Sequence, residues 1–190
     1  MTIETPRLLL RRLSVKEYRE LFEQYSQEDA MLFLGIKTAE QYQEEKRKYD
    51  EGMATYRTSY VMFQLIEKNS GRVIGDCGFH TWHFPHFRAE IGYGLKEEQD
   101  KRQGYMTEAL LAIVDYGFEA MKLNRIEAFV SPDNEPSKRL LQGLGFMEEG
   151  KLREHYYKDG CLHDSLIFGL LKKEYTNSGG GKERVEIISG

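Results

Sequence analysis

A basic glycine turn between an apolar strand and a helix constrains this chain more than any other feature. The turn is Lys101–Glu108, with the sequence KRQGYMTE, and it follows the strand-like segment Glu90–Leu95. Apolar residues then recur at helical spacing from Thr107 to about Met121. The first N–H groups of a helix have no intrahelical partner, and the helix dipole adds positive potential where they point. We therefore expect an anionic group, such as the pyrophosphate of a nucleotide-like cofactor, to bind at this turn.

Length and composition point to one soluble domain. With 190 residues, 40% of them hydrophobic, the chain can bury one core and is too short for two ordinary domains. No apolar run approaches the length of a membrane span, and the start MTIETPRL carries charges where a signal peptide would be apolar. Cys77 and Cys161 are too few for a disulfide framework. We therefore expect a cytoplasmic protein that binds no membrane.

The net charge of −4 bears on the possible partners. Proteins that bind nucleic acid directly usually have a basic surface, so we expect no direct contact with nucleic acid. A mildly acidic protein is compatible with a cationic substrate, although charges spread over the whole surface would give the same total.

Hydrophobic periodicity predicts an α+β architecture, in which an antiparallel meander leads into one β-α-β unit. Strand 125–130 is expected to lie parallel to strand 89–95, because a helix connects them. Residues 1–176 are expected to form a single domain, and residues 177–190 a glycine-rich linker and tail. The expected strands are 7–13, 61–66, 72–79, 89–95, 125–130, 146–151, 155–158 and 166–171, and the expected helices are 38–50, 107–121, 134–144 and one that follows Ser14.

The helix after Ser14 has its own start signal. Ser14 is expected to cap it, with Glu17 three residues on completing a capping box. Its buried face is expected to carry Tyr18, Leu21, Phe22 and Tyr25.

Four stretches, in this order and spacing, resemble the GNAT superfamily of acyl-CoA-dependent N-acyltransferases, and the resemblance extends over nearly the whole chain to Tyr175. The similarity is greatest to the branch of RimJ/RimL-type ribosomal-protein N-terminal acetyltransferases and spermidine acetyltransferases. The stretches are Glu4–Arg11, Ala89–Tyr93, Gln103–Leu110, and Asn134–Ser137 with the downstream Leu144–Phe146.

The resemblance implies a GNAT fold, with a mixed but mostly antiparallel sheet and helices on both faces, and acetyl-CoA as cosubstrate without a metal. Acetyl-CoA would lie in a V between two splaying parallel strands, here Tyr93–Leu95 and Ala128–Val130. Its pyrophosphate would rest on the N–H groups of Arg102 to Thr107. Lys138 and Arg139 could meet the 3′-phosphate, or form only the solvated face of their helix. The expected cofactor-binding residues are Tyr93, Gly94, Leu95, Lys101, Arg102, Gln103, Gly104, Tyr105, Met106, Thr107, Asn134, Lys138 and Arg139.

Gly92 and Gly94 interrupt the strand before the turn. Glycine within a strand often marks a bulge, and a bulge here would turn N–H groups toward the thioester carbonyl. The alternative is that these glycines relieve crowding against an aromatic neighbour. Two positions depart from the pattern that the family usually shows, namely Lys101 for Gln or Arg, and Met106 for a small residue.

Catalysis requires a group that takes a proton from the ammonium of the acceptor. Glu90 is the first candidate for this base, and the alternative is that it forms a structural ion pair with Arg88 or another basic residue. Glu97 and Glu98 are further candidates, and the alternative for each is a solvated charge in a loop. In many enzymes of the family that this chain resembles, a Tyr protonates the leaving thiolate, and this chain has Leu141 at that position. Ser137 is the remaining candidate for the acid. The alternative is that Ser137 is an ordinary hydroxyl in the first turn of its helix. The catalytic candidates are Glu90, Ser137 and Asn134.

The segment His80–Arg88 is expected to be a loop, and it carries three of the five histidines. We expect no metal site, because no Cys or carboxylate nearby completes a tetrahedral set with His80, His83 and His86. A wall of the substrate pocket or an aromatic cap is the expected role. Tyr156, Tyr157 and Asp159 line the acceptor side in the relatives that this chain resembles.

The expected activity is transfer of acetyl from acetyl-CoA to a primary amine by direct attack. The acceptor could be a protein N-terminus, a polyamine or an antibiotic amine. One alternative is a non-catalytic acyl-CoA-binding or sensor module. Another is an interaction protein whose Val185–Ile188 tail adds a strand to a neighbour, and a homodimer is one assembly to be considered.

Overall fold

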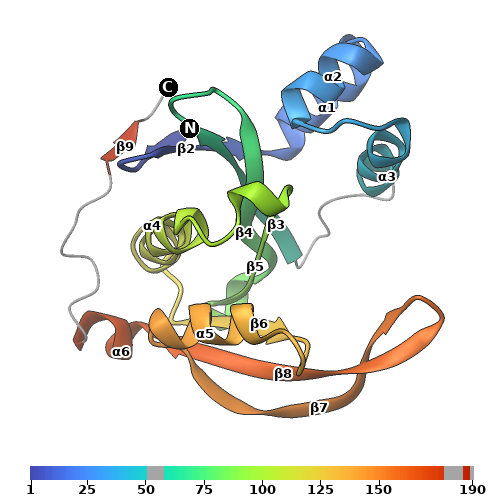
Figure 1. Cartoon of the computed structure of the whole chain (residues 1–190). Helices are drawn as coiled ribbons and strands as arrows, with labels where there is room; N and C mark the ends of the chain where they lie inside the picture. Colours follow the sequence, from blue (N-terminus) through green and yellow to red (C-terminus); the bar gives the residue numbers. More distant parts are fainter. Residues whose placement is uncertain (51–57, 178–185, 189–190) are drawn as a thin grey trace.

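A computed structural model describes residues 1–50, 58–177 and 186–188 of the chain. Its centre is one sheet of nine strands in the order β7-β8-β6-β5-β4-β3-β2-β1-β9, with helices on both faces (Figure 1). All strand pairs are antiparallel except β5 and β6. The predicted α+β architecture is therefore confirmed. No helix of the described residues is both long and apolar enough to cross a membrane.

The first half of the sheet is the predicted meander. Its strands are β1 (Thr2–Glu4), β2 (Leu8–Leu13), β3 (Thr58–Glu67), β4 (Val73–His83) and β5 (Arg88–Leu95). The short β1 was not predicted, and β4 continues through residues 80–83, where a loop was expected. A 3₁₀ turn, Phe84–His86, joins β4 to β5.

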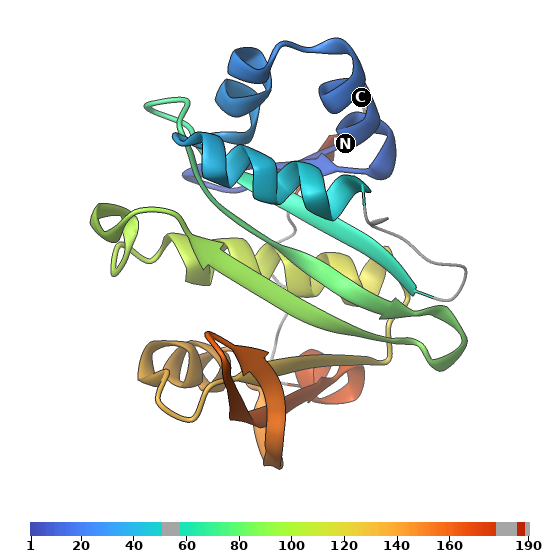
Figure 2. The ribbon, with the colours of Figure 1, turned by 90° about the vertical axis from the view of Figure 1, so that its right-hand side faces the viewer.

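Three helices cover one face of the meander and one helix covers the other (Figure 2). The first face carries α1 (Val15–Gln24), α2 (Gln27–Leu34) and α3 (Ala39–Asp50), and the opposite face carries α4 (Tyr105–Glu119). In α1 the Ser14 N–H donates to Glu17 at 2.7 Å, as the capping-box prediction requires. Tyr18 and Leu21 are buried as expected, but Tyr25 is 54% exposed, because α1 ends at Gln24.

The β5-α4-β6 crossover produces the feature that matters most for function. Strand β6 (Arg125–Val130) pairs in parallel with β5 only from Arg88 to Glu90. Beyond Glu90 the two strands separate, while β6 keeps its pairing with β8 along its whole length. The carboxyl-terminal part of β5 therefore has a neighbour on one side only.

The last elements form a long hairpin and a returning tail. After α5 (Glu135–Gly143), strand β7 (Met147–Lys158) turns at Asp159 and Gly160, both with positive φ, into β8 (Cys161–Leu171). We expected a break within β7, and the structure has instead one strand with an irregularity between Leu152 and Tyr156. Helix α6 (Lys172–Asn177) follows, and β9 (Glu186–Ile188) pairs with β1 of the same chain.

The predicted tail segment is therefore engaged within its own sheet, and its first residue, Val185, lies outside the described residues.

Candidate active site

A cleft of about 630 Å³ opens where β5 and β6 separate. Both strands contribute to its lining, and so does the start of α5. Five of the predicted site residues line it: Glu90, Tyr93, Gly94, Asn134 and Ser137. The remaining lining residues are Lys48, Met62, Asp76, His80, Ile91, Gly92, Ala128, Phe129, Val130, Ser131 and Tyr156.

The basic turn lies at the carboxyl end of β5 and leads into α4. No backbone N–H from Arg102 to Thr107 has a hydrogen-bond acceptor among the described residues, and the helix ladder begins with Glu108 N–H to Gly104 O at 3.1 Å. Arg102 and Gly104 are both left-handed, with φ of 59° and 80°. The turn therefore presents a run of free donors at a helix N-terminus, the arrangement that binds phosphate groups in proteins.

The residues just before β2 hold this turn in place, although they lie near the N-terminus of the chain. Glu108 accepts hydrogen bonds from Thr5 Oγ1 (2.6 Å), Arg7 N–H (2.7 Å) and Arg7 Nε (2.6 Å). Arg7 Nη1 also donates to Gln103 O at 2.8 Å, and the guanidinium lies over the Tyr105 ring. This contact was not predicted, because nothing local in the sequence joins residues about 100 positions apart.

The side chains of the turn differ in what they can offer a ligand. Met106 is buried in the core, so it contributes only backbone to the turn. Lys101 is ion-paired with Glu98. The exposed side chains of Arg102, Gln103 and Thr107 project into solvent.

The start of α5 faces the cleft from the β6 side. Asn134 Oδ1 accepts the Ser137 N–H at 3.2 Å, so Asn134 acts as the N-cap. Burial raises the pKa of Tyr93, and the neighbouring Ser137 partly offsets this effect. The Tyr93 hydroxyl makes no hydrogen bond to any other described residue. Leu141 is fully buried in the core and presents no group to the cleft.

Lys138 and Arg139, the two residues on α5 predicted to contact the 3′-phosphate, differ in whether their charge is already paired within the protein. Lys138 Nζ donates to Pro132 O at 2.8 Å and ion-pairs with Glu135, so its charge is already engaged. Arg139 is exposed.

Glu90 does not form the pair with Arg88 that the structural alternative would require. Arg88 Nη1 instead binds Glu127 at 2.7 Å. Glu90 Oε2 accepts from Thr81 Oγ1 at 3.2 Å, and Glu90 Oε1 lies 3.7 Å from His80 Nε2. The alternatives Glu97 and Glu98 pair with Lys37 and Lys101, outside the cleft lining.

The expected bulge at Gly92 and Gly94 was wrong. These residues pair regularly with Gly78 and Asp76, and the irregularity falls on β4, between Phe79 and Thr81. Gly92 instead gives room to the imidazole of His80, since a Cβ on Gly92 would lie 2.6 Å from His80 Nε2. The alternative interpretation, crowding against an aromatic neighbour, describes Gly92 correctly. Around Gly94 there is open space.

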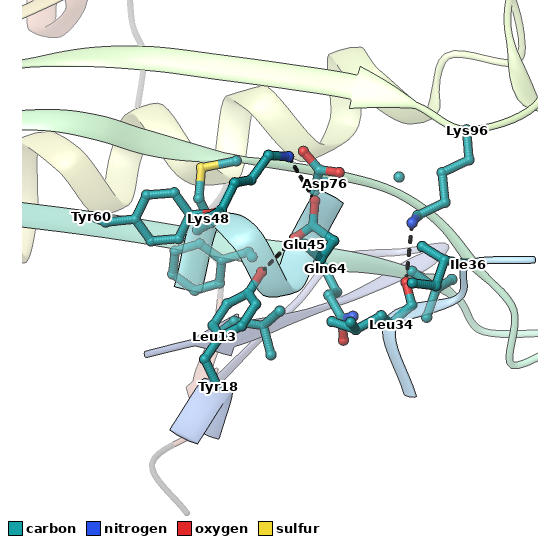
Figure 3. A pocket seen from close by; sticks show the side chains of 14 residues that line it. Leu13, Tyr18, Leu34, Ile36, Glu45, Lys48, Tyr60, Gln64, Asp76 and Lys96 are labelled. Carbon is teal, nitrogen blue, oxygen red and sulfur yellow. Dashed lines mark hydrogen bonds and ion pairs between the residues drawn. The ribbon is translucent and has the colours of Figure 1, made fainter. Parts of the chain in front are cut away.

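A smaller polar cavity of about 120 Å³ adjoins the cleft, between α1, α3 and the outer face of β3 and β4 (Figure 3). The two cavities share Lys48, Met62 and Asp76. Glu45 accepts from Tyr18 at 3.4 Å and ion-pairs with Lys48 at 2.7 Å (Figure 3).

Asp76 stands at the junction of the two cavities and makes no hydrogen bond or ion pair with the described residues. Asp76 is exposed at the cleft, although the protein around it removes part of the water from its carboxylate. This desolvation raises its pKa, and Lys96 opposes the effect.

The histidine segment shows no metal-binding arrangement. Within the described ranges, no three His, Cys, Asp or Glu side chains gather so that they could hold a metal ion. Tyr156 lines the cleft as predicted, while Tyr157 and Asp159 are exposed and do not.

Comparison with known proteins agrees with this architecture. Residues 7–147 match the family described as the acetyltransferase (GNAT) domain. The chain is 35% identical over 182 residues to the N-acetyltransferase p20 of Bacillus licheniformis, covering 92% of this chain and 98% of that protein. It is 29% identical over 119 residues to the [ribosomal protein uS5]-alanine N-acetyltransferase of Escherichia coli (strain K12), covering 62% of this chain and 61% of that protein.

A solved structure, that of a GNAT-family acetyltransferase from Bacillus anthracis, shares the fold. Its TM-score is 0.65 at 27% identity, and the match covers 92% of this chain and 100% of the other. These matches agree with the splayed strands and with the free N–H groups of the turn. The chain is an acetyltransferase that belongs to the GNAT family.

Proposed function

We propose that this protein transfers an acetyl group from acetyl-CoA to a primary amine bound in the cleft between β5 and β6. The observation that carries the proposal is the coincidence of two features at the end of β5. The strand edge is left open beyond Glu90, and the turn that follows offers free N–H groups. An extended pantetheine arm can pair with such an edge, and a pyrophosphate can bind such a turn.

The residues present fit acetyl-CoA. The backbone of residues 102–107 is proposed to hold the pyrophosphate, and the exposed Arg139 on α5 is proposed to meet the 3′-phosphate. Tyr93, Gly94 and Leu95 are proposed to flank the pantetheine, and the acetyl group would then reach the part of the cleft between Glu90 and Ser137.

The amine nitrogen attacks the thioester carbonyl, the new C–N bond forms, and the C–S bond breaks to release the thiolate of CoA. The ammonium loses one proton before the attack, and the nitrogen loses a second proton to solvent as the amide forms. Glu90, whose carboxylate lines this part of the cleft, is proposed to assist removal of the first proton from the acceptor ammonium. Ser137, across the cleft and next to Tyr93, is proposed to protonate the thiolate. Solvent returns one proton to Ser137 after Ser137 has protonated the thiolate, so one proton is released per turnover.

The acceptor side favours a cation. Asp76 is an unpaired carboxylate at the floor of the cleft, so an ammonium group bound there would gain a partner that the protein itself does not supply. The relative that acetylates the alanine of ribosomal protein uS5 makes a protein N-terminus a reasonable first acceptor to test.

A panel of amines with acetyl-CoA tests the proposal, with release of the CoA thiol and mass gain of the amine as readouts. The panel comprises peptides that begin with Ala or Ser, spermidine and an aminoglycoside. Turnover of any of them supports the proposal. Tight acetyl-CoA binding with no turnover on the whole panel would contradict it and favour a sensor.

A further inference from the structure

A β-bulge on β4 places His80 at the cleft beside Glu90. Phe79 pairs with Ile91 and Thr81 pairs with Glu90, so His80 is the extra residue on the β4 side. Bulges redirect side chains and are frequent next to active sites. Here the bulge brings the imidazole and the Glu90 carboxylate to the same part of the cleft lining.

Gly92 shows how closely the imidazole lies against β5. A Cβ on Gly92 would stand 2.6 Å from Nε2 and 2.5 Å from Cδ2 of His80, so a side chain there would displace the ring from this position. Gly92 belongs to the part of β5 that has separated from β6. The imidazole therefore lies at the start of the opening where the thioester is proposed to react.

The hydrogen bonds around His80 determine which ring nitrogen carries the proton. Glu90 Oε2 can only accept, so the hydroxyl hydrogen of Thr81 is donated to it at 3.2 Å. The Thr81 oxygen then accepts at 3.3 Å from His80 Nδ1, which must carry the hydrogen. A neutral imidazole has only one N–H, so Nε2 is left with a free lone pair in the cleft.

The geometry points to His80 Nε2 as the atom that takes the proton from the acceptor ammonium, with Thr81 and Glu90 as positioning residues. The proton passes from R–NH₃⁺ to Nε2, giving R–NH₂ and an imidazolium, and the amine attacks the thioester. Glu90 Oε1, 3.7 Å from Nε2, then stabilises the imidazolium. The imidazolium returns its proton to water at the open side of the cleft, so one proton is released per turnover.

Several charged and titratable groups share the cleft with the imidazole. Glu90 and Tyr93 face it from β5, Asp76 from β4, Lys48 from α3 and Tyr156 from β7. Lys48 is paired with Glu45, and Glu90 is the carboxylate within ion-pair distance of the imidazole, with Oε1 3.7 Å from Nε2.

This inference rests on the proposed acetyl transfer, and its kinetic test uses two variants that differ only in which histidine is changed. The amine is spermidine or an alanine-initial peptide, whichever the wild-type protein acetylates. His80→Gln should lower kcat/KM by about 100-fold or more while acetyl-CoA affinity is unchanged. His86→Gln, on the exposed 3₁₀ turn outside the cleft lining, should keep the wild-type rate. An unchanged rate in His80→Gln, or loss of acetyl-CoA binding in that variant, would overturn the assignment.

A second measurement needs no acceptor and separates failure of this inference from failure of the proposed function. Long-range ¹H–¹⁵N spectra of the free protein at neutral to alkaline pH should show His80 protonated at Nδ1 and bare at Nε2. Thr81→Val should disturb that preference, because Nδ1 loses its acceptor. A wild-type His80 that carries its proton on Nε2 would overturn the inference even if acetyl transfer is shown.

Discussion

Gly104 combines two properties that the turn needs at a single residue. Its φ of 80° is left-handed, and Arg7 Nη2 lies 3.3 Å from where a Cβ would stand. Gly104→Glu would put bulk and negative charge beside the free N–H groups. We expect acetyl-CoA affinity, measured by calorimetry, to fall by at least about 100-fold, or ~2.7 kcal/mol, with the circular dichroism of the fold retained.

Gly71→Glu is the matched control for Gly104→Glu. Gly71 has a similar φ of 68°, lies in the turn between β3 and β4, and has no atom within 4 Å of its Cβ position. The control carries the same backbone strain without touching the cleft, so its acetyl-CoA affinity should match that of the wild type. Equal losses in both variants would show that strain is the cause, and undiminished affinity in Gly104→Glu would remove the phosphate-turn assignment.

Asp76→Asn is expected to raise the melting temperature at pH 7. Burial raises the pKa of Asp76 in the folded protein, so its ionised form costs stability at pH values above that pKa. Below the unfolded-state value of about 3.9 both states are protonated and the cost vanishes. The gain in Tm over wild type should therefore shrink as the pH falls toward about 4.

Thermal unfolding of Asp76→Asn between pH 4 and pH 8 checks this, with Asp133→Asn, on the exposed loop before α5, as the control. An equal or lower Tm for Asp76→Asn at pH 7 would contradict the expected cost. The same variant should raise KM for a cationic acceptor.

At the residue scale, the sequence predicted which residues line the cleft more reliably than it predicted the neighbours of those residues. Glu90, Tyr93, Gly94, Asn134 and Ser137 were predicted and do line the cleft. His80 was expected only as part of a segment that walls the substrate pocket or caps the hairpin, with no role of its own in proton transfer. Its position depends on a bulge, which is set by how β4 pairs with β5 and leaves no mark in the local sequence.

At the scale of elements, the contact between the residues just before β2 and the start of α4 is expected to hold the turn in its binding conformation. Arg7→Ala removes the donor to Gln103 O and one partner of Glu108. The turn should then sample other conformations, and acetyl-CoA affinity should fall by about tenfold, or ~1.4 kcal/mol. Calorimetric titration of the variant measures this.

Lys68→Ala serves as the control for Arg7→Ala. Lys68 is ion-paired with Glu4 on the same part of the sheet but does not touch the turn. If both variants keep wild-type affinity, the contact between β2 and α4 is structural only.

The elements that the sequence failed to predict share a physical cause. In α2, Ala30 and Leu34 are buried while Leu32 is 80% exposed, so the apolar residues follow no single face. Strand β7 was predicted as two strands, because it is exposed along almost its whole length and its pairing with β8, not a buried face, makes it continuous. By contrast, α4, β3, β5 and β6 surround the main core and have regular apolar spacing, and these were predicted, as was β4 up to Phe79.

At the scale of the whole molecule, two hydrophobic clusters on opposite faces of the sheet support the cleft. One lies between the sheet and α4, and the other lies under α1, α2 and α3. The cleft opens where the sheet itself divides, and the chain returns its tail strand to the far edge beside β1. Such long-range placement follows from the order of strands in space, which local sequence patterns do not contain.

Hydrogen–deuterium exchange with and without acetyl-CoA tests the central claim most directly, because it reports on all backbone amides at once. We predict protection on binding at the separated part of β5 (91–95), at the turn (102–107) and at the end of β6 (128–130). Peptides from α1, α2 and α3 should exchange as before. Protection confined to those helices, or no protection at the turn when binding is saturated, would contradict the assignment of this cleft as the acetyl-CoA site.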